Sequence, residues 1–266
     1  MDTDVGVRPR SLTLLGVGFA AAVTLGAVFA LGFSISLVGS LWPASRSHLT
    51  VAALVEVLVT LGLSLALVSF GEMRAALARA QWRWILLGCA LGVLLHGPAD
   101  FVEAWVQQTW PVSDAVWRER VLRLSPAAPL ERSALFALVA LAVPVVEELF
   151  FRGALFSRLH AALSPALNAG VTSLCFTLSH VEPRSWPALS LVAAALGVVR
   201  LWTQSLLPCI LLHATFNATT LSVVFLSPRA ALQPSEPSLP AALVGGLASV
   251  ALLSWLGRES RFGRVR

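Results

Sequence analysis

Eight apolar stretches, most of them close to 20 residues long, dominate this chain of 266 residues. An α-helix of about 20 apolar residues spans the hydrocarbon core of a bilayer. Because such a segment must satisfy its backbone polar groups internally and no strand-like alternation is present, the stretches predict helices. They lie at 12–38, 50–70, 84–98, 133–151, 166–181, 187–203, 206–226 and 240–257. The sequence therefore predicts an all-α fold, a polytopic membrane bundle of about eight transmembrane helices.

Composition agrees with a membrane protein. Hydrophobic residues make up 57% of the chain and charged residues only 12%, whereas a soluble domain contains about 25% charged residues. All 19 basic residues are arginine, but they form no basic runs interleaved with aromatic residues, so we expect no nucleic-acid partner. Arginine in the loops of a membrane protein is expected to face anionic lipid.

The chain is expected to form one integral-membrane domain over residues 1–266. The first stretch is too long for a signal-peptide core of about 7–15 residues, so it predicts a retained helix. If both termini are cytoplasmic, 12 of the 19 arginines lie on the inner side, which agrees with the positive-inside rule. The expected location is the bacterial inner membrane. In the long outer loop, residues 101–132, we expect an amphipathic helix at the interface.

Charged residues end the fourth stretch in the sequence EELFFR, residues 147–152. An ionisable group at membrane depth is costly to bury and is functional by default. Glu148 and Arg152 are four residues apart, so they share a helix face and can form an ion pair. Glu147 is left without a partner in its own segment. Alternatively, the three charges only mark the end of a span, in the headgroup region.

Two further polar pairs lie in later stretches. Phe176 and His180 are one turn apart in the fifth, and His213 and Asn217 are one turn apart in the seventh. Alone, each pair is explained as well by an interfacial histidine or a hydrogen bond between helices. With Glu147, they supply what hydrolysis requires: a base for water, a residue that orients it, and donors for the developing negative charge.

The membrane depths of these residues agree only in part. A rise of about 1.5 Å per residue places Glu147 about 21 Å from the outer start of its stretch and His213 about 10 Å from an inner start. These depths match in a core of about 30 Å. The same count places His180 about 21 Å from an inner start, nearer the outer face. The fifth stretch must start later, tilt or be drawn inward if His180 is to meet Glu147.

Three motifs occur complete and in order: EExxxR at Glu147, Glu148 and Arg152, FxxxH at Phe176 and His180, and HxxxN at His213 and Asn217. This combination resembles the CPBP family, the CAAX-endopeptidase and bacteriocin-processing family, also called Abi. The resemblance covers residues 133–226, the expected catalytic core, whereas the first three stretches match only in being hydrophobic. It implies intramembrane hydrolysis of a peptide bond in a catalytic cavity among the helices.

The resemblance also implies residue roles. Glu147 would activate the water with the help of His180, and His213 and Asn217 would bind the oxyanion. Glu148, Arg152 and Phe176 would support the site or the substrate. The expected mechanism is of the glutamic type, without a cofactor. A zinc mechanism with Glu147, His180 and His213 as ligands stays open by ligand type, although no HExxH motif is present.

The expected partners are membrane lipid and a protein or peptide substrate. A lipidated C-terminal motif, a bacteriocin leader and a C-terminal sorting signal are all compatible with such relatives. For a bacterial chain, a prenylated CAAX protein is the least expected substrate, and a sorting-signal protease similar to the myxosortases is favoured.

Two other functions fit less well. A non-catalytic scaffold or immunity protein of the same fold would be favoured by the loss of a motif residue, and none is lost. A proton-coupled transporter could use Glu147 and His213 as a relay, but the sequence shows no inverted repeats or paired broken helices. Glu56, His96 and Asp100 are kept outside the catalytic set. Glu56 is expected to pair within the membrane or face the cavity, and the other two to be interfacial.

Overall fold

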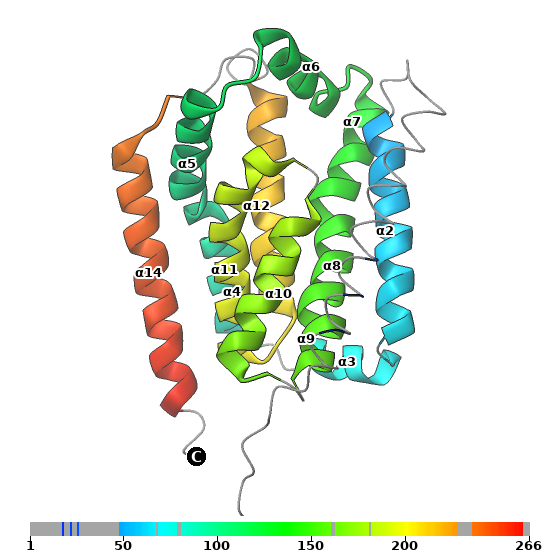
Figure 1. Cartoon of the computed structure of the whole chain (residues 1–266), viewed down its shortest axis with the longest axis vertical. Helices are drawn as coiled ribbons and strands as arrows, with labels where there is room; N and C mark the ends of the chain where they lie inside the picture. The colour runs from blue at the N-terminus through cyan, green and yellow to red at the C-terminus, as the bar shows by residue number, and fades with distance from the viewer. Residues whose placement is uncertain are drawn as a thin grey trace, which may run out of the picture.

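The computed structural model describes residues 48–67, 69–78, 81–160, 163–180, 182–227 and 236–262, with isolated positions at 18, 22 and 26. Every regular element in these residues is a helix, and they contain no strand. The helices form a bundle with α2 (His48–Leu67) and α14 (Leu239–Phe262) at opposite edges (Figure 1). The predicted all-α class is thereby confirmed.

Six described segments are long and apolar enough to cross a membrane. They are Leu49–Leu67, Trp82–Thr109, Pro129–Leu159, Pro183–Thr203, Leu207–Leu226 and Leu239–Ser260. Large apolar side chains are exposed on them, such as Leu58 and Leu247, which are 61% and 69% exposed. Such side chains suit a surface that faces lipid, because lipid tails are as apolar as leucine. The chain is therefore an integral membrane protein.

The predicted number of eight spans is not reached in the described residues. The predicted span 12–38 lies outside them, apart from the three isolated positions. The predicted span 166–181 is helix α10 (Pro165–Ser179), which has 15 residues. Its length of about 22 Å is less than the hydrocarbon thickness of about 30 Å. α10 thus enters the bundle but is too short for a full span.

The third span continues well beyond its expected end. The stretch 84–98 predicts a helix that ends near Pro98, but α4 (Trp82–Leu94) and α5 (His96–Thr109) form one segment of 28 residues. Pro98 lies in the first turn of α5, where a missing backbone N–H is tolerated. His96 and Asp100 are therefore inside this segment, and their interfacial location stays a prediction.

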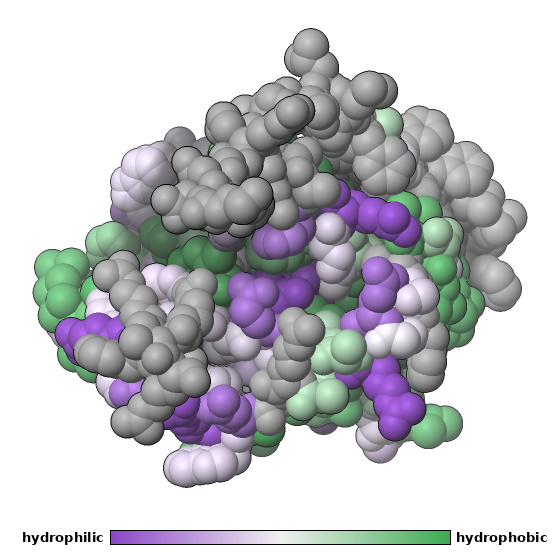
Figure 2. All heavy atoms as spheres, turned by 90° about the horizontal axis from the view of Figure 1, so that it is seen from below, coloured by the Kyte–Doolittle hydropathy of each residue, from purple (hydrophilic) through white to green (hydrophobic). Residues whose placement is uncertain are grey.

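Two short helices lie at the ends of the bundle. α6 (Asp114–Leu124) crosses the upper end in Figure 1, and α3 (Phe70–Ala78) lies at the lower end. α6 is the helix predicted in the loop 101–132, and Ser113 caps it by accepting a hydrogen bond from the Val116 N–H. Figure 2 views the lower end, where hydrophilic side chains gather between apolar ones at the margin. This is the distribution expected where a bundle meets water.

The segment that carries EELFFR is irregular on both sides of the glutamates. It passes through α7 (Pro129–Phe136), the π-helix η1 (Ala137–Ala142), α8 (Val143–Glu148), the π-helix η2 (Leu149–Leu155) and α9 (Phe156–Leu159). Pro144, which has no backbone N–H to donate, lies where η1 passes into α8. π-Helical turns are rare and often occur at functional sites. Glu147 and Glu148 thus belong to a short α-helix between two wider turns.

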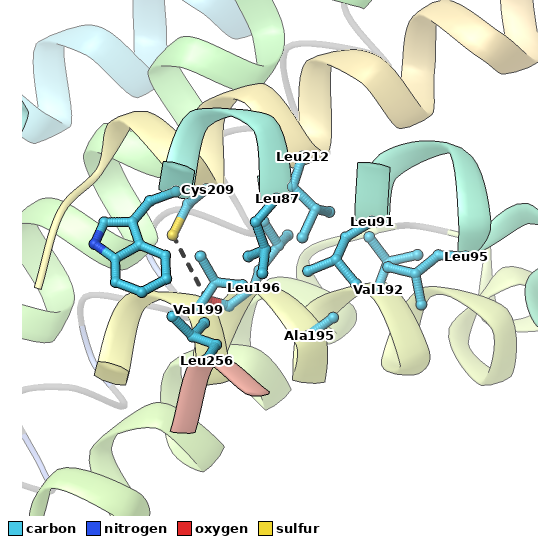
Figure 3. Close-up of a cluster of buried hydrophobic side chains, with 11 residues drawn as sticks. Leu87, Leu91, Leu95, Val192, Ala195, Leu196, Val199, Cys209, Leu212 and Leu256 are labelled. Carbon is cyan, nitrogen blue, oxygen red and sulfur yellow. Dashed lines mark hydrogen bonds between the residues drawn. The ribbon is translucent and has the colours of Figure 1, made fainter. Parts of the chain in front are cut away.

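Close packing on α4 fixes the position of α12 (Leu207–Leu226). A Cβ atom at Gly92 of α4 would lie 2.6 Å from the Leu212 carbonyl oxygen, so only glycine allows this approach. Figure 3 shows the buried cluster at this contact, where Cys209 Sγ lies 3.6 Å from the carbonyl oxygen of Leu196 in α11 (Trp186–Thr203). This packing fixes the position of the α12 backbone that carries His213.

Candidate active site

EELFFR lies in the interior of the bundle. Glu147 is 4% exposed, and Glu148 and Arg152 are fully buried. Their segment continues to Leu159, so the alternative that the three charges only mark the end of a span is wrong. Ionised groups in such surroundings are strongly unfavourable unless other polar groups pair with them.

Glu148 and Arg152 form the predicted ion pair. Arg152 Nη1 lies 3.0 Å from Glu148 Oε1, and Nη2 donates a hydrogen bond of 3.2 Å to the Ala193 carbonyl in α11. The same Oε1 atom of Glu148 lies 3.1 Å from His213 Nδ1. One carboxylate therefore connects η2 to α12, and the guanidinium balances its charge.

His213 lies between the two glutamates. Glu148 is a carboxylate and can only accept, so Nδ1 carries a hydrogen and donates to it. Nε2, on the other side of the ring, lies 3.6 Å from Glu147 Oε2. Glu147 therefore faces a histidine nitrogen at a distance that is too long for a good direct hydrogen bond.

Phe176 of α10 is at the centre of the cluster. It is 1% exposed, and the Arg152 guanidinium carbon lies 4.6 Å from its ring centroid. Its ring centroid lies 4.9 Å from that of His180 and 5.5 Å from that of His213. This aromatic residue of the FxxxH motif thus fixes the spacing between the arginine and both histidines.

His180 follows the last residue of α10, and its backbone is extended. Its Nδ1 lies 2.9 Å from the Phe176 carbonyl oxygen, which can only accept, so Nδ1 carries the hydrogen and Nε2 is the basic nitrogen. The His180 carbonyl accepts a hydrogen bond from Trp186 Nε1 at 2.7 Å. His180 interacts electrostatically with His213, but in the described part of the chain no ion pair joins it to Glu147. The structure brings it to the cluster and not into direct contact with the glutamates.

Asn217 lies one turn beyond His213 on α12. Its Nδ2 donates a hydrogen bond of 2.9 Å to the Val139 carbonyl, which belongs to the π-helix η1. An amide nitrogen has two hydrogens, and this bond uses one of them. The contact links α12 to η1 and holds the Asn217 amide on the side of α12 that faces the glutamate-bearing segment.

Glu56 of α2 is the residue that the motifs miss. Its side chain lies close enough to Glu147, His180 and His213 to interact electrostatically with them. The structure therefore places it beside the cluster. The signal was present in the sequence as a single carboxylate within the apolar run VAALVEVLVT. The residue that Glu56 faces could not be predicted, because nothing in one sequence shows that α2 packs on α8.

The expected zinc ligands do not form a metal site in the described residues, where no group of three His, Cys, Asp or Glu side chains is arranged to hold an ion. The ring nitrogens of His213 are turned to carboxylates, and Nδ1 of His180 is bonded to a backbone carbonyl. These Nδ1 contacts leave Nε2 of both histidines available, so the zinc set Glu147, His180 and His213 stays an alternative.

A groove of about 510 Å³ follows one face of α12 next to η1. Its lining includes Leu141 and the small residues Ala214, Ala218 and Ser222. Neither the glutamates nor the histidines of the cluster line it. The cavity expected around the catalytic residues therefore stays a prediction.

Residues 129–219 match the family model described as Type II CAAX prenyl endopeptidase Rce1-like. The matched segment begins with α7 and ends within α12, so it contains all three motifs. No curated protein and no solved structure matches the chain. The family model describes endopeptidases, which favours a protease over a scaffold or a transporter. Over residues 129–219, this integral membrane protein is similar to the CAAX endopeptidase family.

Proposed function

We propose that the chain is an intramembrane endopeptidase of the glutamic type, which hydrolyses a peptide bond near the terminus of a membrane-associated protein or peptide. The contrast between the adjacent glutamates carries the proposal. Glu148 is fixed by Arg152 and His213 at 3.0 and 3.1 Å. Glu147 lies 3.6 Å from His213 Nε2, so it keeps acceptor capacity for a water molecule.

In the proposed reaction, Glu147 accepts a proton from water while the water oxygen attacks the scissile carbonyl carbon. His180 Nε2 accepts a hydrogen bond from the same water and orients it. His213 and the second amide hydrogen of Asn217 stabilise the negative charge on the carbonyl oxygen. The tetrahedral intermediate then collapses, the C–N bond breaks, and the proton on Glu147 passes to the leaving amine. The products are one carboxylic acid and one amine.

Three residues support this chemistry without touching the reacting atoms. Glu148 holds the Nδ1–H of His213, which directs Nε2 towards Glu147. Arg152 balances the charge of Glu148, and Phe176 packs against Arg152 and both histidines. The proposal uses no metal.

For the substrate, we propose a C-terminal sorting signal of a protein on its way to the cell surface. A lipidated C-terminal motif and a bacteriocin leader are the other substrates of the same class. The proposed location is the bacterial inner membrane with both termini in the cytoplasm, supported by the excess of arginine on the inner side. Membrane lipid surrounds the bundle, and nucleic acid is not a partner.

The test compares the wild type with Glu147→Gln in the native host, because glutamine keeps the size of the side chain and cannot accept the proton. Mass spectrometry of membrane and surface protein termini is the readout, at equal protein level. We expect a set of termini to disappear in Glu147→Gln and to persist in Glu131→Gln, a matched change in the first turn of α7. Unchanged termini in both variants would contradict the protease and favour the scaffold, and altered uptake with unchanged termini would favour the transporter.

A further inference from the structure

The π-helix that follows the glutamates releases one backbone carbonyl. At the end of η2, the N–H of Phe156 donates to the carbonyls of Phe151 and Gly153. In an α-helix the same N–H would donate to the carbonyl of Arg152, four residues back. The Arg152 carbonyl has therefore lost its α-helical donor, and a buried carbonyl in that position needs another one.

Arg200 of α11 takes the place of this donor. Its Nε donates a hydrogen bond of 2.8 Å to the Arg152 carbonyl. The Arg200 side chain is 5% exposed, and its guanidinium carbon lies 4.9 Å from the ring centroid of Phe156. The bond thus forms in the interior of the bundle, where a charged group is costly to bury and needs well-placed partners.

The π-helix before the glutamates shows the same replacement. At the end of η1, the N–H of Val143 donates to the carbonyl of Leu138, five residues back, and so passes over the carbonyl of Val139. The Val139 carbonyl accepts the hydrogen bond from Asn217 Nδ2 at 2.9 Å. Each π-helix beside α8 therefore has one released carbonyl that accepts from a side chain of another helix.

Arg200 is connected to the active site through Arg152. α11 bonds Arg152 at both ends, since Arg200 holds its backbone carbonyl and the Ala193 carbonyl accepts from Nη2 at 3.2 Å. Nη1 of the same guanidinium lies 3.0 Å from Glu148, which in turn lies 3.1 Å from His213 Nδ1. A shift of the Arg152 backbone would therefore move Glu148 and His213.

We infer that Arg200 is a positioning residue of this active site: it replaces the backbone donor of the Arg152 carbonyl, keeps η2 in its π-helical form and thereby fixes the contact between Arg152 and Glu148. This role rests on the proposed function. Arg200 belongs to none of the three motifs and touches neither the water nor the substrate in the proposed reaction. It acts through geometry alone, and no proton is exchanged at it.

Two substitutions of similar length separate the hydrogen bond from the charge. In Arg200→Gln the amide nitrogen takes the position of Nε and still donates, so we expect kcat to stay within about threefold of the wild type. In Arg200→Met a methyl group takes that position, and we expect kcat to fall about 100-fold, the size of effect that a misplaced catalytic group produces. The KM is expected to change little in both. Both variants lose the charge and the contact with Phe156, so the difference between them reports the hydrogen bond.

Arg158 provides the matched control. Its Nε also donates to a backbone carbonyl at 2.8 Å, that of Leu67 at the end of α2, but this contact is exposed. Arg158→Met and Arg158→Gln should both keep the kcat of the wild type. Kinetics are measured on the purified full chain in lipid nanodiscs, with a peptide that spans a cleavage site found by the comparison of termini.

Amide hydrogen exchange, followed by mass spectrometry, tests the contact without any need for activity. We expect residues 149–156 to exchange at least about tenfold faster in Arg200→Met than in the wild type, and at the wild-type rate in Arg200→Gln. Equal exchange in all three proteins would overturn the inference. If Arg200→Met does not accumulate, Arg200→Gln decides: wild-type exchange and kcat support the replacement of the donor, and a kcat about 100-fold lower refutes it.

The remaining outcomes separate the inference from the proposed function. If Glu147→Gln is inactive but Arg200→Met keeps the kcat of the wild type, Arg200 does not position the site. If Arg200→Gln is as inactive as Arg200→Met, the charge matters and not the donor, and the positioning role is refuted. If Glu147→Gln itself cleaves the peptide, the proposed function fails and the positioning role fails with it, whereas the exchange rates still show whether Arg200 holds η2.

Discussion

Arg152→Met tests how the fold holds the buried charges. Arg152 is fully buried, and its guanidinium lies 3.0 Å from Glu148 Oε1 and donates at 3.2 Å to the Ala193 carbonyl. Its guanidinium carbon also lies 4.6 Å from the ring centroid of Phe176. Methionine fills a similar space without a charge, so Glu148 would remain buried with only His213 as a polar partner.

The expected magnitude follows from the uncompensated carboxylate. Removing one partner of a buried ion pair destabilises a protein by about 3–5 kcal/mol. The cation–π contact is worth about 0.5–2 kcal/mol, but it is lost with the same guanidinium and is not added separately. We therefore expect the free energy of unfolding to fall by about 3–5 kcal/mol, which lowers the folding equilibrium constant more than about 100-fold. Adding Glu148→Gln removes the stranded charge and should restore at least half of the loss.

The assay is reversible unfolding in mixed detergent micelles, followed by the fluorescence of the nine tryptophans. The wild type, both single variants and the double variant form a cycle that isolates the pair interaction. Arg83→Met is the control, since the Arg83–Glu259 pair at 2.9 Å has side chains 38% and 36% exposed, and such pairs contribute about 0–1 kcal/mol. A loss below about 1 kcal/mol for Arg152→Met, or a double variant that loses the sum of the single losses, would refute the reasoning.

Four further predictions concern other parts of the molecule. Gly92→Ala would place a Cβ atom 2.6 Å from the Leu212 carbonyl oxygen, so the same unfolding assay should show a loss of about 1–3 kcal/mol, and an unchanged stability would contradict the close packing of α4 on α12. Phe176→Leu removes the ring between Arg152 and the histidines, and we expect cleavage of the reporter peptide to fall at least about tenfold while the protein still accumulates. Treatment with a zinc chelator should leave cleavage unchanged, and a loss that added zinc alone reverses would favour the metal mechanism. The Ser69 N–H and hydroxyl donate to Glu72 at 2.9 and 2.8 Å, which lowers the pKa of Glu72 below that of a free glutamate side chain. This stabilisation is present above that pH and lost as the pH falls through the folded pKa, so Ser69→Ala should raise the pKa of Glu72 in an NMR titration.

Helix periodicity and bilayer thickness were enough to predict most of the bundle. The ion pair of Glu148 and Arg152 could be predicted because both residues lie on one helix and their spacing fixes their distance. The length of the third span could not be predicted, because proline ends a helix in most contexts, whereas Pro98 lies in the first turn of α5. The π-helices on either side of α8 could not be predicted either. The estimate of membrane depth assumed a regular α-helix, with a rise of about 1.5 Å per residue.

The position of Glu56 could have been inferred from charge pairing, although not from any motif. A carboxyl group in the middle of an apolar span must find a polar partner. The arginine of EELFFR is expected to pair with Glu148 by spacing alone, which leaves Glu56 and Glu147 as two intramembrane carboxyl groups without a cation. The partners that the other spans offer them are histidine, Arg200 and each other. In the structure Glu147 faces His213 and lies near Glu56. Pairing the charges within the spans thus constrains helix packing in a way that the depth of a single residue does not.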